Sequence, residues 1–200
     1  MRFFTKDKQD KVIIVHLGNI GLDDAAKTRQ YAKRFQNFRF YGIDLAKLTG
    51  QIPSNWEQIK TNFLNGLSIF QDDSIDIVSS ELGLGYYNAN GEISDPFFNK
   101  IELEKIEKYT KNVVECIFKK LKKGGKLLIV VGRGEHRDYV LNSLNIFHFR
   151  ILEMRKLREN ELERTGYIKH FEEMYHNNPD LFSKFDLSPP NLIQIVAEKV

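Results

Sequence analysis

Apolar residues gather in short runs along this chain, and longer amphipathic stretches separate most of them. A run of four to eight apolar residues has the length of a strand that is buried on both faces. Such strands, alternating with helices, favour a parallel, doubly wound α/β sheet. The runs cover residues 12–15, 38–43, 75–78, 127–131, 147–154 and 192–196.

The stretches between these runs predict helices. Asp23 and Asp24 favour the start of a helix that continues to about residue 35. A second helix spans 99–121 and ends at the turn 123–126, and a third spans 135–144. The second has one apolar face at helical spacing, formed by Ile106, Tyr109, Val113, Ile117 and Leu121.

The C-terminal third departs from this alternation. Residues 147–157 predict a strand, 159–175 a polar helix, and the chain ends in a last strand. No helix with a matching apolar face joins these two strands, so an antiparallel pair fits better than a crossover. We therefore expect a single domain over 1–200, with an insertion at about 158–188 between the last two strands.

Composition narrows the class of protein without naming its ligand. The 200 residues are 42% hydrophobic and 28% charged, with a formal net charge of +3, which is ordinary for a globular α/β domain. The lysines at 119, 120, 122 and 123 are typical of a solvated helix end, although an RNA-binding surface stays open as an alternative. Cys116 is the only cysteine, which excludes an internal disulfide.

No targeting or membrane segment is predicted from the sequence. The charged N-terminus lacks the apolar stretch of a signal peptide, and no apolar run reaches the length that crosses a bilayer. We therefore expect a cytoplasmic protein that does not enter membranes.

The first two predicted strands carry the clearest site pattern. The first is followed by Gly18 and Gly21, and the second ends on Asp44. A glycine turn lets the backbone approach a ligand, and a helix N-terminus behind it carries partial positive charge. An acid at the tip of the neighbouring strand can accept hydrogen bonds from a ribose diol. This arrangement favours a nucleotide-like cofactor.

Four stretches together resemble the class I S-adenosylmethionine-dependent methyltransferases, over roughly 11–157 and the last strand. They are 12–21, 41–44, 74–80 and 121–130, of which the last is the most similar to its counterpart in the family. The resemblance implies a Rossmann-like, mostly parallel seven-stranded sheet with an antiparallel C-terminal strand, and S-adenosylmethionine as cofactor. It implies that the cofactor-binding residues are Gly18, Gly21, Asp44, Asn65 and Ser80.

Three positions depart from the family pattern. His16 stands where an acid is usual, Ile20 where a small residue is usual, and Asn65 where an acid commonly binds the adenine amino group. His16 either turns a ring nitrogen toward the cofactor or is a satisfied histidine at a strand tip. The departures motivate an alternative: a non-catalytic, methyltransferase-like binding domain that has lost part of the cofactor site.

The catalytic candidates are Glu81, at the end of the fourth-strand motif, and Tyr86, in the loop that follows it. Methyl transfer from a sulfonium is an in-line displacement that mainly requires alignment, so a nucleophilic triad is not needed and none is seen. The histidines show no usable metal-ligand spacing, and we expect no metal site.

The methyl acceptor is a small molecule or RNA, and the oligomeric state does not follow from the sequence. RNA enters because 163–172, 95–97 and 137–139 loosely resemble segments of the tRNA guanine-N7 methyltransferases. The aromatic-Pro-Asp-Pro-Trp run of that family is absent after Ser80. A nicotinamide-dependent dehydrogenase is a weaker alternative for the glycine turn.

Overall fold

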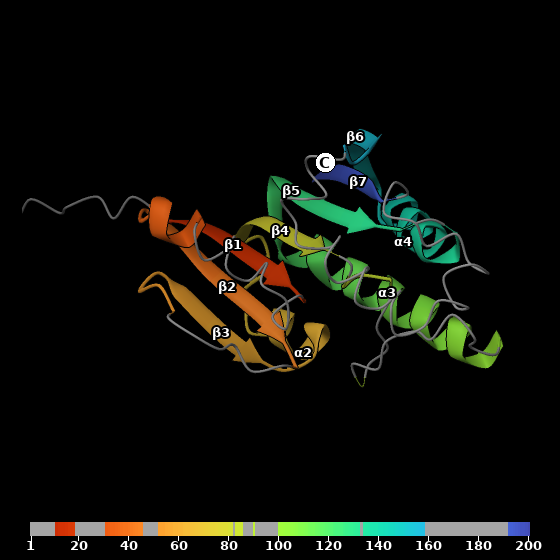
Figure 1. Cartoon of the computed structure of the whole chain (residues 1–200), viewed down its shortest axis with the longest axis horizontal. Coiled ribbons are helices and arrows are strands. Elements are labelled where there is room, and N and C mark those ends of the chain that lie inside the picture. The colour runs from red at the N-terminus through yellow and green to blue at the C-terminus, as the bar shows by residue number, and fades with distance from the viewer. Residues whose placement is uncertain are drawn as a thin grey trace, which may run out of the picture.

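In the computed structural model, seven strands of the described residues form one mixed sheet (Figure 1). The structure describes residues 11–18, 31–45, 52–81, 83–85, 90, 100–132, 134–158 and 192–200. The strands are β1 (Val12–Leu17), β2 (Phe38–Asp44), β3 (Trp56–Lys60), β4 (Ile75–Glu81), β5 (Leu121–Val131), β6 (Phe149–Lys156) and β7 (Ile193–Lys199). The described helices with full bounds are α2 (Phe63–Ser68), α3 (Lys100–Lys120) and α4 (Glu135–Ile146).

The strand order is β3-β2-β1-β4-β5-β7-β6. The first five strands are parallel, and β7 runs antiparallel to both β5 and β6. This confirms the predicted doubly wound sheet with its antiparallel C-terminal strand. From β1 the chain adds β2 and β3 on one side, and it then crosses to β4 on the other side of β1. The strand order therefore reverses at β1. In open α/β sheets, ligands bind at such a reversal, beyond the carboxyl ends of the strands.

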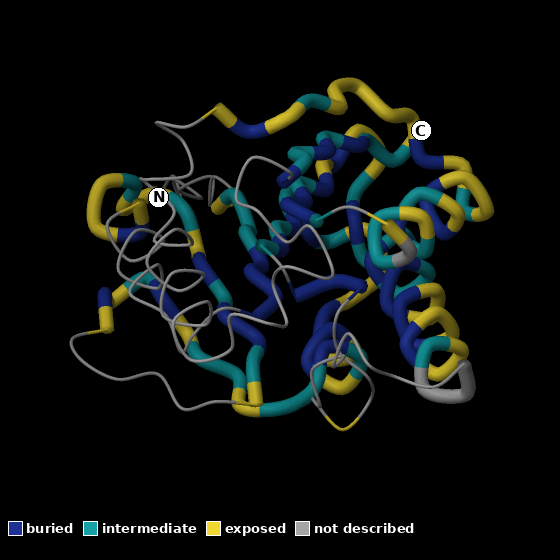
Figure 2. Tube along the Cα trace, turned by 45° about the vertical axis from the view of Figure 1, so that its right-hand side comes forward, coloured by how far each residue is buried: buried dark blue, intermediate teal, exposed yellow. Residues whose placement is uncertain are grey.

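The core lies between the central strands and α3 (Figure 2). Val15 and Leu17 of β1 face this layer together with Ile43 of β2, and all three are fully buried. The predicted apolar face of α3 is confirmed, because Ile106, Tyr109, Val113 and Ile117 are all buried in this helix.

The junction of α3 and β5 differs from the sequence prediction. The helix ends at Lys120 and β5 begins at once with Leu121, which pairs with Ile75. The next pair is Ile77 with Lys126, so the register shifts and residues 122–125 form an irregular section inside the strand. The predicted turn is therefore an irregular part of β5, because the residues on both sides of it pair with β4.

β3 and α2 are not predicted from the apolar runs. β3 is an edge strand with Glu57, Gln58 and Lys60 among its five residues, so it lacks the continuous apolar character of a central strand. The helix α2 has only six residues, too few for a periodic pattern. The end of β3 and the start of α2 lie at the edge of the sheet where the site was predicted.

The C-terminal strands β6 and β7 confirm the predicted antiparallel pair. Lys156 at the end of β6 pairs with Ile193, which in turn pairs with Val131 at the end of β5. The connection between β6 and β7 therefore leaves and re-enters the sheet at the carboxyl edge of β5. The predicted insertion, the helix over 159–175 and most of the helix over 23–35 lie outside the described residues.

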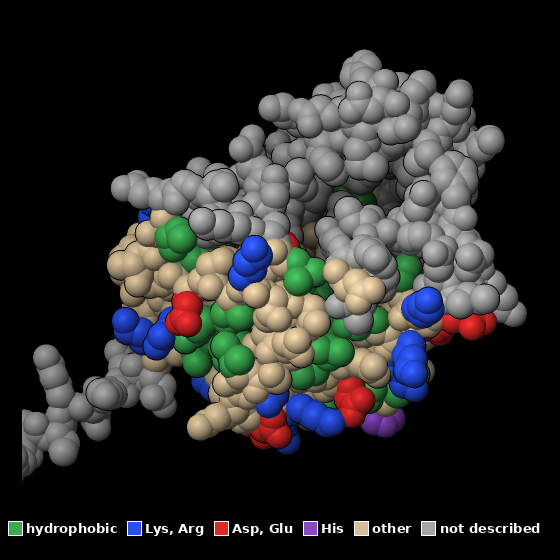
Figure 3. All heavy atoms as spheres, turned by 90° about the horizontal axis from the view of Figure 1, so that it is seen from below, with side chains coloured by type: hydrophobic (Ala, Val, Ile, Leu, Met, Phe, Trp, Pro, Cys, Tyr) green, Lys and Arg blue, Asp and Glu red, His purple; other side chains and the backbone are tan. Residues whose placement is uncertain are grey.

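Three of the four lysines around the α3–β5 junction are paired with acids. Lys119 binds Glu115 at 2.6 Å, Lys120 binds Asp72 at 2.8 Å, and Lys122 binds Asp76 at 2.8 Å. Figure 3 likewise shows Lys and Arg side chains beside Asp and Glu side chains on one face of the molecule. These contacts agree with the interpretation of the cluster as a solvated helix end. None of the described helices is long and apolar enough to cross a membrane.

Candidate functional site

The predicted site residues that the structure describes gather at the carboxyl edge of β1, β2 and β4, except Asn65. The strand register sets their levels: Leu17 lies beside Ile43 on one side and beside Ser80 on the other. Gly18, Asp44 and Glu81 come directly after these three residues. They therefore lie at neighbouring strand tips, as the sequence predicts.

Gly18 forms a tight turn against the loop after β4. Its φ is +80°, a conformation that side chains disfavour, and its N–H donates to the carbonyl of Ile43 at 3.0 Å. A Cβ here would lie 3.3 Å from Gly83 Cα and 3.4 Å from Phe63 Cζ. The turn thus brings bare backbone to the edge of the sheet. Gly21 and Ile20 lie outside the described residues.

Ser80 links this turn to the loop that follows β4. It is fully buried, donates to the carbonyl of Leu17 at 3.2 Å, and accepts from the N–H of Leu84 at 3.0 Å. Both capacities of the hydroxyl are used inside the chain. A role in cofactor binding would therefore be indirect, through the position of the glycine turn.

Asp44 is half-buried at the last position of β2, and its carbonyl accepts from the N–H of Thr61 at 3.0 Å. This bond closes the β2 tip against the start of the β3–α2 connection. The side chain of Asp44 points to the same face as Gly42, two residues earlier. On that face the amide of Gln58 lies over Gly42, because a Cβ at Gly42 would be 2.5 Å from Gln58 Oε1.

His16 lies on the same face, 5% exposed, with its Nδ1 2.8 Å from Ser79 Oγ. It pairs in register with Gly42 on one side and Ser79 on the other. Burial lowers the pKa of the imidazole, since charge is costly away from water, and the carboxylates of Glu81 and Asp44 oppose that shift. The histidine predicted at the strand tip thus lies on the same face of the sheet as both acids.

Asn65 lies apart from this cluster, exposed on α2, where its backbone N–H donates to Asn62 Oδ1 at 2.9 Å. The residue nearer the tip of β3 is Asn62, the N-cap of α2. The position of Asn62 at a strand tip was not predicted, because β3 was not predicted. The signal present was a strand-length segment followed by an asparagine at a capping position.

The loop after β4 is held against α4 as well. Glu81, the last residue of β4, is half-buried. Gly85 follows with φ +90°, and its carbonyl oxygen lies 2.8 Å from His136 Nδ1. This tie between the loop and α4 was not predicted. Tyr86, the second catalytic candidate, lies outside the described residues.

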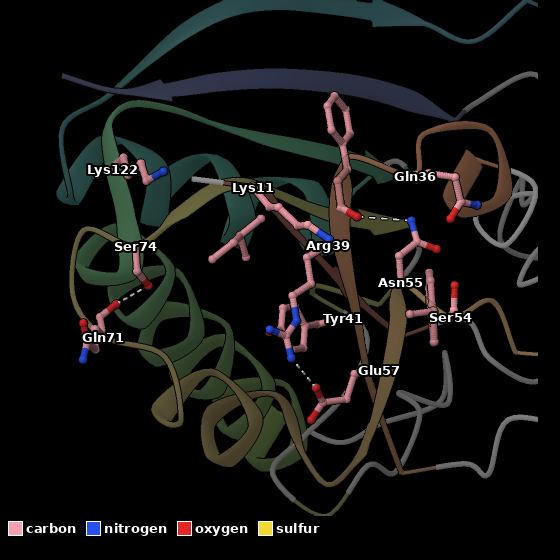
Figure 4. Close-up of a pocket in the computed structure, with 13 residues that line it drawn as sticks. Lys11, Gln36, Arg39, Tyr41, Ser54, Asn55, Glu57, Gln71, Ser74 and Lys122 are labelled. Carbon is pink, nitrogen blue, oxygen red and sulfur yellow. Dashed lines mark hydrogen bonds and ion pairs between the residues drawn. The ribbon is translucent and has the colours of Figure 1, made fainter. Parts of the chain in front are cut away.

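A cavity of about 1020 Å³ lies at the opposite, amino end of β1, β2 and β3 (Figure 4). It contains none of the predicted site residues. Two of its cationic side chains are paired with acids: Arg39 binds Glu57 at 3.3 Å and Lys122 binds Asp76 at 2.8 Å. The described residues contain no group of three or more side chains that could hold a metal ion.

No protein-family model matches the sequence, and no curated protein matches it. Similar folds are found among solved structures. The geranyl diphosphate C-methyltransferase from Streptomyces coelicolor A3(2), solved with Mg²⁺, geranyl diphosphate and S-adenosyl-L-homocysteine, is 11% identical with a TM-score of 0.64. That alignment covers 96% of this chain and 73% of the methyltransferase.

Two further structures show how widely the fold is used. A methyltransferase described as SAM dependent, from Archaeoglobus fulgidus, has a TM-score of 0.57 at 12% identity, over 94% of this chain and 86% of that chain. The [4+2]-cyclase SpnF has a TM-score of 0.57 at 14% identity, over 94% of this chain and 74% of that chain. The resemblance to the class I methyltransferases is thus confirmed for the fold. Because a cyclase shares it, the fold alone does not fix the reaction.

Proposed function

We propose that this protein is an S-adenosylmethionine-dependent methyltransferase that binds its cofactor at the carboxyl edge of β1 and β2. One juxtaposition carries the proposal: the left-handed turn at Gly18 lies beside Asp44, at the point where the strand order reverses. Exposed backbone and an adjacent carboxylate suit a ligand with a ribose diol.

The residues present fit such a cofactor. The glycine turn leaves room that a Cβ would fill, against Gly83 and Phe63. Gln58 Nε2 is buried and has no hydrogen-bond partner among the described residues, and its amide lies over Gly42, two residues before Asp44. The site therefore holds a carboxylate and a buried amide donor on the same face of the sheet. Both groups suit the polar edges of a nucleoside.

The cofactor, when bound, supplies a methyl group on a positively charged sulfur. In the proposed reaction, a lone pair of the acceptor bonds to that carbon, and the carbon–sulfur pair stays on sulfur, which leaves a neutral thioether. The chain contributes alignment, which makes up much of such catalysis. Glu81 is the described candidate for orienting the acceptor or taking its proton, because it is half-buried beside the same turn.

We favour a small-molecule acceptor over RNA. Three lysines of the basic cluster that suggested RNA are paired with acids, which reduces the positive field they can offer to phosphates. Arg137, in one of the segments similar to the tRNA methyltransferases, is also paired, with Asp138 at 2.8 Å. RNA stays as an outcome of the test below.

Binding without turnover is the second candidate function. Two observations favour it. His16 is buried in the place where the family has an acid, and Asn65 is exposed on α2, away from the strand tips. This candidate predicts cofactor binding but no methylated product.

The first experiment measures binding of S-adenosylhomocysteine by calorimetry and by the shift in Tm. We expect a rise in Tm, because a ligand that binds only the native state stabilises it. Asp44→Asn should weaken binding at least about tenfold, which corresponds to one lost charge-assisted hydrogen bond. Asp72→Asn, an exposed acid at the other end of the sheet, should leave it unchanged. Absence of binding at millimolar ligand to the wild-type protein contradicts the proposal.

The second experiment follows labelled methyl groups from the cofactor into total RNA and into a metabolite extract. Label in the metabolite fraction supports the favoured acceptor class, and label in RNA replaces it with RNA. Binding without label in either fraction supports the non-catalytic candidate.

A further inference from the structure

His16 occupies a central place in the candidate site. It lies two residues before the turn at Gly18 and is 5% exposed. Its Nδ1 is 2.8 Å from Ser79 Oγ, and this contact fixes the orientation of the ring.

The sheet register puts His16 and two acids on one face. His16 pairs with Gly42 and with Ser79, so Asp44 and Glu81, each two residues further along its strand, point to the same side. These are the carboxylates whose charges act on the imidazole. The Ser79 hydroxyl and the Gln58 amide over Gly42, which lie on the same face, are neutral. Lys60 pairs in register with Asp44 and is exposed.

Protonation of His16 therefore changes the charge balance of this face. Burial keeps the imidazole neutral at neutral pH because it lowers the pKa, and the ring gains a proton only on acidification. A neutral His16 adds no charge to this face, whereas a protonated His16 adds one positive charge that opposes binding of a cation there.

We propose that His16 is a specificity-determining residue that sets the preference of the site for the sulfonium form of the cofactor over its thioether form. This inference rests on the proposed function. S-adenosylmethionine and S-adenosylhomocysteine share adenine, ribose and the amino acid end, and they differ in one methyl group and one positive charge on sulfur. The shared contacts contribute about equally to the two dissociation constants, so the ratio of these constants reports the local charge. A neutral His16 favours the sulfonium, and a protonated His16 disfavours it.

The experiment measures Kd for both ligands by calorimetry from about pH 7 down to about pH 5, on the acidic side of the ordinary histidine pKa. We expect the ratio Kd(S-adenosylmethionine)/Kd(S-adenosylhomocysteine) to rise about three- to tenfold on acidification, the effect of one unit charge several ångströms away in a partly solvated site. In His16→Gln, which keeps a polar group beside Ser79, the ratio should stay flat. In His148→Asn, an exposed histidine in the turn after α4, the rise should persist.

A second measurement needs no variant and so does not depend on how His16→Gln folds. Because linkage is reciprocal, bound S-adenosylmethionine should lower the pKa of His16, followed by NMR in the wild-type protein, more than bound S-adenosylhomocysteine does. Equal values in the two complexes overturn the inference, as does a pH-independent ratio in the wild-type protein. Failure of both ligands to bind at any pH instead contradicts the proposed function.

Discussion

Gly66 lies in the middle of α2 and packs against Ile43, the residue before Asp44. Ile43 is fully buried. A Cβ at position 66 would lie 2.4 Å from Ile43 Cγ2 and 2.8 Å from its Cδ1, and such contacts do not occur in packed proteins. Gly66→Ala must therefore displace either α2 or the side chain beneath the tip of β2.

Two opposing effects set the size of this change. Overpacking a well-filled core costs about 1–3 kcal/mol. Alanine gains about 0.5–1 kcal/mol over glycine inside a helix, because glycine loses more backbone freedom on folding. The overpacking is larger, so we expect a net loss of about 1–2 kcal/mol in the free energy of unfolding. For a domain of this size, that lowers Tm by about 2–8 °C.

Urea denaturation followed by circular dichroism measures this loss, and a double-mutant cycle tests its cause. In an Ile43→Ala background the clashing atoms are absent, so Gly66→Ala should there be neutral or stabilising, with a coupling energy of at least about 1 kcal/mol. Ser68→Ala, on the exposed side of the same helix, should change stability by less than about 0.5 kcal/mol. A Gly66→Ala protein as stable as the wild type, or an equal effect in both backgrounds, refutes the reasoning.

Three further predictions use the same denaturation assay. Tyr109→Phe should cost about 1–2 kcal/mol, because its hydroxyl accepts the buried N–H of Phe63 at 3.2 Å, and an equal stability would contradict this. Asp76→Ala should cost about 2 kcal/mol through the lost bond to the β1 backbone at 2.8 Å, whereas Lys122→Ala, its surface ion-pair partner, should cost less than about 1 kcal/mol. Because burial lowers the pKa of His16, the unfolded chain binds more protons as pH falls below about 6.5, so stability should decrease from pH 7 to pH 5. His16→Gln should flatten that slope, and an unchanged slope would show that other groups cause it.

The parts of the fold that sequence predicts well are those with a strong periodic pattern. The central strands β1 and β4 are bordered on both sides by other strands, so their apolar runs are visible without an alignment. The helix α3 shows its buried face at helical spacing over 21 residues. Edge strand β3 has neither signal, because one of its sides is open and three of its five residues are polar. Because β3 was not predicted, the sequence did not show that Asn62 lies nearer the strand tip than Asn65 does.

Pairings between distant strands could not be predicted, because they depend on register. The bond between His16 and Ser79 joins residues 63 positions apart, and it forms because these two residues are neighbours across β1 and β4. The same register puts Ser80 beside Leu17, and the Ser80 hydroxyl donates to the Leu17 carbonyl, directly before the glycine turn. A slip of one residue would exchange the two serines between the faces of the sheet.

Strand parity explains why the predicted site residues divide into two groups. Successive side chains of a strand point to opposite faces, so residues next to each other in sequence have different surroundings. Ser80 belongs to the face covered by α3 and is fully buried. His16, Asp44 and Glu81 belong to the other face, where two carboxylates act on one buried imidazole. The acids could be found from the sequence as strand-end residues, but only the register brings them together. The proposed pH dependence of ligand preference follows from that shared face, because protonation of His16 would change its charge by one unit beside the Gly18 turn.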